Sequence, residues 1–280
     1  MKFIIKLLKK FFFVIILLIA LVGVGFPKQS QNNYFINYKY LSFEDINKNF
    51  FIDKEIEVPL VAVVNQISDD NIEDTLTQNI ILGSLKIYLL KTKNNETKNN
   101  NQKHINHYKI FIDDKIKLNE TTIKSIFDSV NYIEKKLKIE NQYFISYNLN
   151  SKSLSGTSSG ASIALGIFLL NHNKKPNLNF IISGSIDDEG NLLPSGSIYY
   201  KSIFIDKHNQ KISEKNYVEK YSIKNNFYNI LYVSKGQSKT LLKLDNNMYK
   251  EISINNLTKT LKVVELNNID EILNKIDYLE

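Results

Sequence analysis

Short runs of apolar residues, some alternating with polar ones, recur along the chain and predict β-strands. These runs are rich in Ile, Val, Leu, Tyr and Phe and are bounded by polar or turn-forming residues, a pattern typical of strands. Pro59 lies inside the first run and cannot donate to a hydrogen-bond ladder, so we expect that strand at a sheet edge or with a bulge. The expected strands cover residues 56–64, 82–90, 108–112, 143–149, 179–186, 230–233 and 261–264.

A second periodicity, close to that of an α-helix, appears between these strands. Apolar residues recur at helical spacing over 121–137, where lysines follow at the end. Residues 161–170 are almost wholly apolar and follow a loop of small residues, and helices are also expected over 199–208 and 269–279. Because strands and helices interleave without a strict βαβ repeat, we expect an α+β fold.

The first 27 residues differ in character from the rest. Lysines are spread over residues 1–10, and Phe11 to Phe26 form an unbroken apolar run of sixteen residues. Such a helix reaches about 24 Å, short of a hydrocarbon core of about 30 Å. We therefore expect residues 1–27 to be a cleaved signal peptide or a retained membrane anchor. The lysines before the run predict a bacterial protein at the cytoplasmic membrane, with its folded part outside the cytoplasm, or exported if the signal is cleaved.

Composition removes several classes of chemistry. The absence of Cys excludes disulfides, thiolate metal sites and a cysteine nucleophile. All 36 basic residues are lysine, and five of them lie in the first 28 residues, where there is no acidic residue. The remaining 31 lysines face 29 acidic residues, so the net charge of +7 falls to +2 and no nucleic-acid partner is expected. His104 and His107 lack a third ligand, so no metal site is expected.

Two clusters of small residues could carry chemistry. The first runs from Ser155 to Ser162 at the start of the apolar helix, where backbone N–H groups favour a phosphate or the oxyanion of acyl transfer. A simple capped helix start is the alternative. The second runs from Ser183 to Lys201, and burial of this lysine would lower its pKa and suit it to act as a general base. A surface lysine on an amphipathic helix is the alternative here.

Together the two clusters resemble the proteolytic domain of the Lon family of serine–lysine peptidases. The family's first signature, Asp-Gly-Pro-Ser-Ala-Gly, corresponds to residues 155–160, which read Ser-Gly-Thr-Ser-Ser-Gly. Its second, Thr-Gly-Glu followed by a hairpin and Leu-Pro-x-Gly-Gly, corresponds to Ser183-Gly184-Ser185 and to residues 193–197, with Lys201 four residues beyond. The resemblance extends from about residue 82 to the end and is most specific over 142–201.

The resemblance implies a role for each of these residues. Ser158 corresponds to the nucleophile, Lys201 to the base that takes its proton, and Ser183 to the hydroxyl that orients the lysine. Backbone N–H groups around Ser158, Ser159 and Gly160 would form the oxyanion hole. The implied activity is that of a serine endopeptidase, which hydrolyses polypeptides with a Ser-Lys dyad. The implied fold is that of the Lon proteolytic domain, of the ribosomal protein S5 domain 2-like type.

The same resemblance sets the expected organisation of the chain. We expect a polar tether over residues 28–52 and one proteolytic domain over 53–280, most securely 105–280. No ATPase module is present, and the stretch 234–240 lacks the glycines of a phosphate loop, so the activity is expected to need neither ATP nor a cofactor. A homo-oligomeric ring is also in keeping with the family.

Three departures from the signatures keep other functions open. Ser155, Thr157 and Ser197 stand where the family has Asp, Pro and Gly. A non-catalytic, membrane-tethered Lon-like binding domain is one alternative. A GHMP-type small-molecule kinase is another, because its Gly/Ser-rich loop before a helix looks similar to residues 155–162. The kinase explains neither Lys201 nor an export signal.

Overall fold

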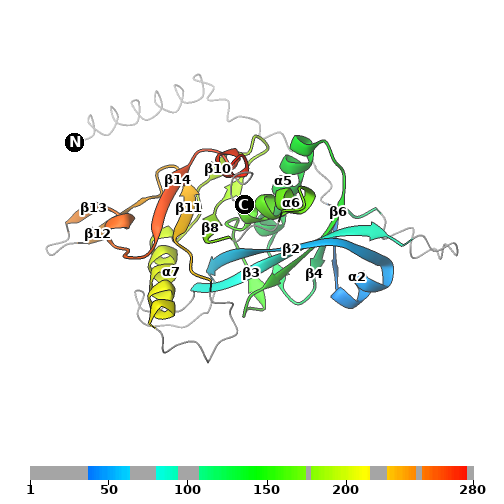
Figure 1. Ribbon diagram of the computed structural model, residues 1–280, viewed down its shortest axis with the longest axis horizontal. Coiled ribbons are helices and arrows are strands. Elements are labelled where there is room, and N and C mark those ends of the chain that lie inside the picture. Colours follow the sequence, from blue (N-terminus) through cyan, green and yellow to red (C-terminus); the bar gives the residue numbers. More distant parts are fainter. Residues whose placement is uncertain are drawn as a thin grey trace, which may run out of the picture. The chain divides into compact units, whose positions relative to one another are not determined.

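A five-stranded mixed sheet supports the two helices that make up one side of the candidate site (Figure 1). The computed structural model describes residues 37–63, 80–93, 107–174, 178–214, 226–243 and 248–275. In sheet order the strands are β1 (Tyr38–Leu41), β4 (Ile110–Asp113), β6 (Gln142–Asn148), β3 (Ile80–Thr92) and β2 (Phe50–Val63). β1, β4 and β6 run parallel to one another, whereas β3 is antiparallel to both β6 and β2. The fold belongs to the α+β class.

The edge position predicted from Pro59 is confirmed. β2 is the last strand of the sheet and pairs with β3 alone, a position in which a proline is tolerated. The register of this pair shifts between Ile52 and Lys54. The bulge therefore lies at the start of β2 and not at the proline.

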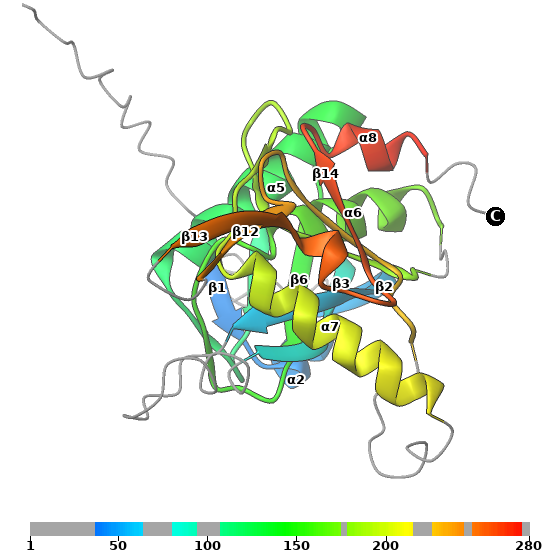
Figure 2. The same cartoon turned by 90° about the vertical axis from the view of Figure 1, so that its left-hand side faces the viewer.

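Helices cover both faces of the sheet (Figures 1 and 2). Helices α5 (Glu120–Leu137) and α6 (Gly160–Asn171) lie side by side on one face, and α2 (Phe43–Asn49) packs on the other. α6 is buried on all sides from Gly160 to Leu170 because it lies between α5 and the sheet, which explains why its sequence is apolar all round. On β3, Leu85, Ile87 and Leu89 join the α6 side, and Tyr88 and Leu90 join the α2 side.

A second, smaller sheet holds the other half of the candidate site. Its parallel strands are β14 (Lys262–Leu266), β11 (Ile230–Ser234) and β8 (Phe180–Ser183), in that order. Helix α7 (Ile198–Ser213) packs on it through Ile198 and Ile205. A short hairpin of β9 (Ser185–Ile186) and β10 (Leu192–Leu193) leads from β8 to α7.

The remaining elements are short. They are the parallel pair β5 (Lys117–Leu118) and β7 (Ser153–Leu154), the hairpin β12 (Lys239–Lys243) and β13 (Tyr249–Ser253), a 3₁₀ turn at Ile254–Asn256 and α8 (Asp270–Leu273). The predicted strand over 179–186 is divided at Gly184 into β8 and β9, and the predicted closing helix over 269–279 is a single turn within the described residues. The β12–β13 hairpin was not predicted, because its strands contain four lysines or glutamates among ten residues and lack a buried face.

Part of the tether predicted over 28–52 is folded. Within it, β1 pairs with β4 and α2 packs on the sheet. Ile46 and Phe50 are buried in a cluster of apolar side chains on that face.

The expectation of a membrane anchor is corrected. No helix in the described residues is long and apolar enough to cross a membrane. α6 is apolar but spans 12 residues, about 18 Å, and α5 carries charged side chains on its outer face. This finding corrects the expected transmembrane helix, the expected signal and the expected location at the cytoplasmic membrane. Residues 1–27, on which that expectation rested, lie outside the described residues.

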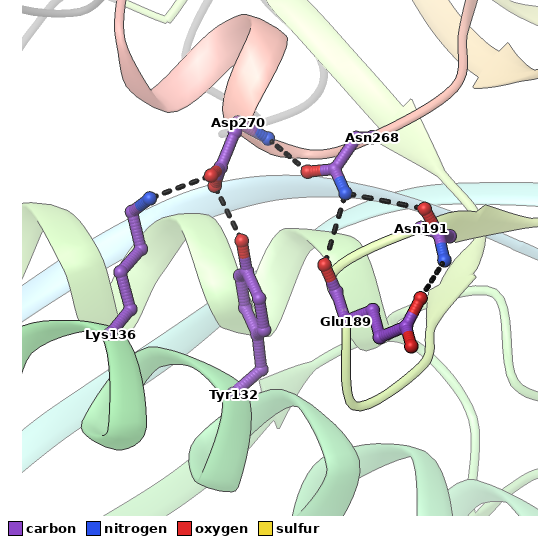
Figure 3. A network of polar contacts seen from close by, with 6 residues as sticks. All are labelled: Tyr132, Lys136, Glu189, Asn191, Asn268 and Asp270. Atoms are coloured by element: carbon purple, nitrogen blue, oxygen red, sulfur yellow. Dashed lines mark hydrogen bonds and ion pairs between the residues drawn. The ribbon is translucent and has the colours of Figure 1, made fainter.

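A polar network pins the β9–β10 turn, which separates Ser183 from α7 (Figure 3). On one side, the Asp270 carboxylate accepts from Tyr132 Oη (2.6 Å) and pairs with Lys136 Nζ (2.6 Å), both from α5. On the other side, Asn268 Nδ2 donates to Glu189 O (3.0 Å). Backbone bonds from Ile269 N to Gly190 O and from Leu192 N to Asn267 O complete the attachment. The turn is thus fixed to α5 and to the start of α8.

Substitution of Gly190 tests this attachment. Gly190 has φ +80°, and a Cβ there would overlap the Tyr132 ring, whereas Gly236 has φ +84° with nothing within 4 Å of a Cβ. Gly236→Ala should lower the free energy of unfolding by about 1–2 kcal/mol through left-handed backbone strain alone. Gly190→Ala should cost roughly 1–3 kcal/mol more, because the overlap adds to that strain. Equal losses in urea unfolding would show that the Tyr132 contact has no energetic weight.

Candidate functional site

Buried hydroxyl groups of α5 hold the loop of residues 155–160 in place. Three of them lie on one side of the helix and donate to backbone carbonyls of the loop and of the first residue of α6. The pairs are Thr122 Oγ1 to Gly156 O (2.8 Å), Ser125 Oγ to Thr157 O (3.0 Å) and Ser129 Oγ to Gly160 O (2.8 Å). Because each carbonyl is satisfied from α5, the loop keeps a defined path without regular secondary structure.

Gly160 allows this close approach of α5. A Cβ at Gly160 would overlap Ser125 Oγ and would lie 3.1 Å from Ser185 Cα. A larger residue would push the start of α6 away from α5 and from β9. The glycine is therefore required by packing.

The loop is also tied to the break between β8 and β9. Gly184 N donates to Ser158 O (3.0 Å), and Ala161 N donates to Gly184 O (2.9 Å). Ser158 is thereby held next to the residue that follows Ser183. The Ser158 side chain is half-buried, and the structure gives its hydroxyl no hydrogen bond within the described residues.

The backbone N–H groups of this loop differ in what they bind. Gly160 N donates to Thr157 O (3.1 Å). The N–H groups of Ser158 and Ser159 have no protein acceptor among the described residues. Two adjacent free donors beside a free hydroxyl are suited to an oxyanion.

Ser159, the neighbouring serine, is engaged elsewhere. It is 2% exposed, and its hydroxyl lies 3.2 Å from the hydroxyl of Tyr147 on β6. Tyr147 is itself buried, and burial raises its pKa. The two adjacent serines are therefore distinguished by their surroundings, since Ser158 is accessible and Ser159 is part of the interior.

Lys201 enters the interior from the first turn of α7. Ser197 precedes the helix with φ +61°, and Lys201 N donates to Ser197 O (2.9 Å). The side chain is 1% exposed, and Nζ donates to Ser183 Oγ at the end of β8 (2.9 Å). Burial lowers the pKa of Lys201 to about 8, because an ammonium loses its hydration there. Roughly a tenth of Lys201 is therefore neutral at pH 7 and about half at pH 8.

Ser195 and Gln237 complete the site and were not given roles from the sequence. Ser195 Oγ lies 3.0 Å from Ser183 Oγ. Gln237 holds the backbone of Ser195 on both sides, with Ser195 N donating to Oε1 (3.1 Å) and Nε2 donating to Ser195 O (2.6 Å). Ser195 occupies the variable position of the Leu-Pro-x-Gly-Gly signature, which left no signal for it. Gln237 lies in the stretch that was weighed only as a phosphate loop.

The residues named from the sequence thus meet at the end of β8 in different ways. Ser183 contacts Lys201 directly through its side chain, and Ser158 is attached through the backbone of Gly184. No hydrogen bond joins Ser158 to Lys201 within the described part of the chain. A serine–lysine pair would require the two side chains to come into hydrogen-bond contact, a tightening common between free and substrate-bound active sites.

The described histidines lie elsewhere. His172 follows α6, stacks on Phe168 and bonds Phe168 O, so the 12-residue length of α6 separates it from the loop. His208 lies further along α7, and burial lowers its pKa. His104 is outside the described residues. Within the described ranges, no group of three or more His, Asp or Glu side chains could hold a metal ion.

No protein-family model and no curated protein matches this chain. The geometry of the site therefore carries the argument for function.

Replacing Lys201 by Met tests the cost of burying the amine. The pKa of Lys201 is about 8 in the folded chain against 10.5 ordinarily, so the unfolded chain binds more protons between these values and the stability of the parent rises with pH there. Lys201→Met should be more stable by up to about 3 kcal/mol below pH 8, and this advantage should shrink towards pH 10.5. Urea unfolding between pH 6 and pH 10 measures it.

Lys207→Met is the matched control, because Lys207 is an exposed lysine on the same helix. It should change stability little at any pH. If both variants behave alike, the burial of Lys201 carries no such cost.

Proposed function

We propose that this protein is a serine endopeptidase that cleaves polypeptides, with Ser158 as the nucleophile and Lys201 as the general base. One observation carries the proposal: a buried lysine with a lowered pKa lies at the end of β8, where the Ser158 loop is also attached. A serine hydroxyl becomes an effective nucleophile only when an adjacent base removes its proton. Among the described residues near the loop, Lys201 supplies such a base.

The acylation step follows from these positions. The neutral amine of Lys201 takes the Ser158 proton while Ser158 Oγ attacks the scissile carbonyl carbon. The carbonyl oxygen becomes an oxyanion, which the free N–H groups of Ser158 and Ser159 stabilise. The ammonium of Lys201 then gives its proton to the leaving amine, so that the C–N bond breaks and an ester on Ser158 remains.

Deacylation repeats the same sequence with water. Lys201, neutral again, takes a proton from a water molecule that attacks the ester carbonyl. It returns that proton to Ser158 Oγ as the ester bond breaks and releases the new carboxyl group. Ser183 accepts one N–H of Lys201 throughout, which keeps the amine at the end of β8.

The finer classification is part of the same proposal. We propose that the domain is a Lon-type proteolytic domain of the ribosomal protein S5 domain 2-like fold, acting without ATP. The α+β class and the adjacency of the two signature clusters support it. A homo-oligomeric ring stays a prediction. We do not propose the kinase-like alternative, since a lysine that binds phosphate must be charged and accessible, whereas Lys201 is buried with a lowered pKa.

Single and double substitutions test the dyad. Ser158→Ala and Lys201→Gln should each lower kcat on an unfolded polypeptide by at least about 10³-fold, and the double variant should be no worse, because both changes remove the same activated nucleophile. Parent activity should be independent of ATP and should rise as the pH passes about 8, where Lys201 loses its proton. Peptide release followed by mass spectrometry measures these rates.

Ser159→Ala is the control, because its hydroxyl contacts Tyr147 in the interior. It should retain substantial activity. A dead Ser159→Ala variant beside an active Ser158→Ala variant would move the nucleophile by one position. A parent chain that cleaves no polypeptide, yet folds, would favour the non-catalytic binding domain.

A further inference from the structure

A chain of hydrogen bonds runs from Lys201 through two buried serines. Lys201 Nζ donates to Ser183 Oγ (2.9 Å), and Ser183 Oγ lies 3.0 Å from Ser195 Oγ. Ser195 Oγ in turn donates to Ser183 O (3.4 Å). All three side chains are buried. The chain therefore ends on a backbone carbonyl inside the protein.

One arrangement of the protons gives every hydroxyl in this chain an acceptor. The contact between the two serine hydroxyls allows either of them to donate, but a carbonyl oxygen only accepts. When the Ser195 proton goes to Ser183 O, Ser195 Oγ accepts from the Ser183 hydroxyl. Because the Ser183 O–H then donates a hydrogen bond to Ser195 Oγ, Ser183 Oγ can only accept a hydrogen bond from Lys201. One N–H of the lysine is bound in this way, and the lone pair of the neutral amine is left free.

We propose that Ser195 is a positioning residue for the proposed reaction, which holds the Ser183 hydroxyl as an acceptor and so keeps the Lys201 lone pair free for the Ser158 proton. This inference rests on the proposed peptidase function. Without the Ser195 hydroxyl, Ser183 could turn its own O–H towards the neutral amine. That bond would occupy the lone pair that the reaction needs, and it would favour the neutral form of Lys201.

The backbone of Ser195 is held from a different part of the chain. Gln237 binds both its N–H and its carbonyl, and Gly236 (φ +84°) turns the chain just before Gln237. These two bonds hold the backbone of Ser195 at the place where its hydroxyl contacts Ser183. This assigns a role to the stretch 234–240, whose small residues form the turn that holds Ser195.

The charged groups around Lys201 do not offer another explanation. β8 and the turn at 194–197, which supply the two hydroxyls, contain no titratable side chain. On α7 the carboxylate is Asp206, which accepts from the backbone N–H groups of Lys259 and Thr260. Burial is the cause of the lowered pKa of Lys201. A change in that pKa in a Ser195 variant would therefore report the hydroxyl chain.

Ser195→Ala, Ser195→Thr and the control Ser202→Ala test the inference in the full chain. Ser202 is a buried serine beside Lys201 on α7 whose hydroxyl donates to Ile198 O (2.8 Å), outside the chain of bonds. The pKa of Lys201 is measured by NMR of ¹³Cε-labelled lysine, with its signal identified by its loss in Lys201→Gln. Plateau kcat and KM are measured on an unfolded polypeptide.

Ser195→Ala should lower the pKa of Lys201 and reduce plateau kcat roughly tenfold, the effect of one lost hydrogen bond, with KM unchanged. Ser195→Thr should restore both values, and Ser202→Ala should match the parent. A merely structural role predicts the opposite pKa change, because loosened packing admits water and returns the pKa of Lys201 towards its ordinary value.

An unchanged or raised pKa in Ser195→Ala would overturn the inference, as would an effect of equal size in Ser202→Ala. The NMR measurement needs no turnover, so it separates this inference from the proposed function. If the parent cleaves no polypeptide while Ser195→Ala still lowers the pKa of Lys201, the direction of the hydroxyl chain stands and the peptidase proposal fails.

Discussion

The burial of a lysine amine at the end of β8 is the constraint on which the rest of the site depends. Burial disfavours the charged ammonium and lowers the pKa of Lys201. Within the described residues, the amine has a hydrogen bond to Ser183 in place of an ion pair. An acidic partner would have stabilised the charge and raised the pKa. Burial is the cause of the pKa shift of Lys201, and it lowers the pKa. A lowered pKa suits a general base, which must be neutral in order to act.

Hydroxyl groups and glycines, and not charges, assemble the surroundings of this amine. Serines and a threonine on α5 hold the Ser158 loop, and Ser195 meets Ser183 beside Lys201. Hydroxyls can satisfy buried carbonyls without bringing a charge into the interior. Gly160 lets two helices approach closely enough for these bonds to form. Among the described residues, the hydroxyl of Ser158 and the N–H groups of Ser158 and Ser159 have no hydrogen-bond partner.

Periodicity predicted most of the regular structure, because the sheet and α6 are buried and their apolar patterns are strong. The helix over 121–137 and the strand over 82–90 are examples. The polar interior was beyond this kind of inference: Thr122, Ser125 and Ser129 interrupt the apolar face of α5, and their partners lie more than 30 residues away. The signatures pointed to Ser183 and Lys201, which lie in contact. They gave no signal for Ser195 or Gln237, whose contact joins residues 42 apart.

The central claim is that Lys201 activates Ser158, and covalent trapping tests it most directly. A reagent that acylates activated serines, such as a β-lactone, would leave an ester that mass spectrometry of the digested protein can locate. The account predicts one adduct, on Ser158, that forms faster as the pH rises through about 8 and is lost in Lys201→Gln. An adduct on Ser159, or labelling of Ser158 that Lys201→Gln leaves unchanged, would contradict it.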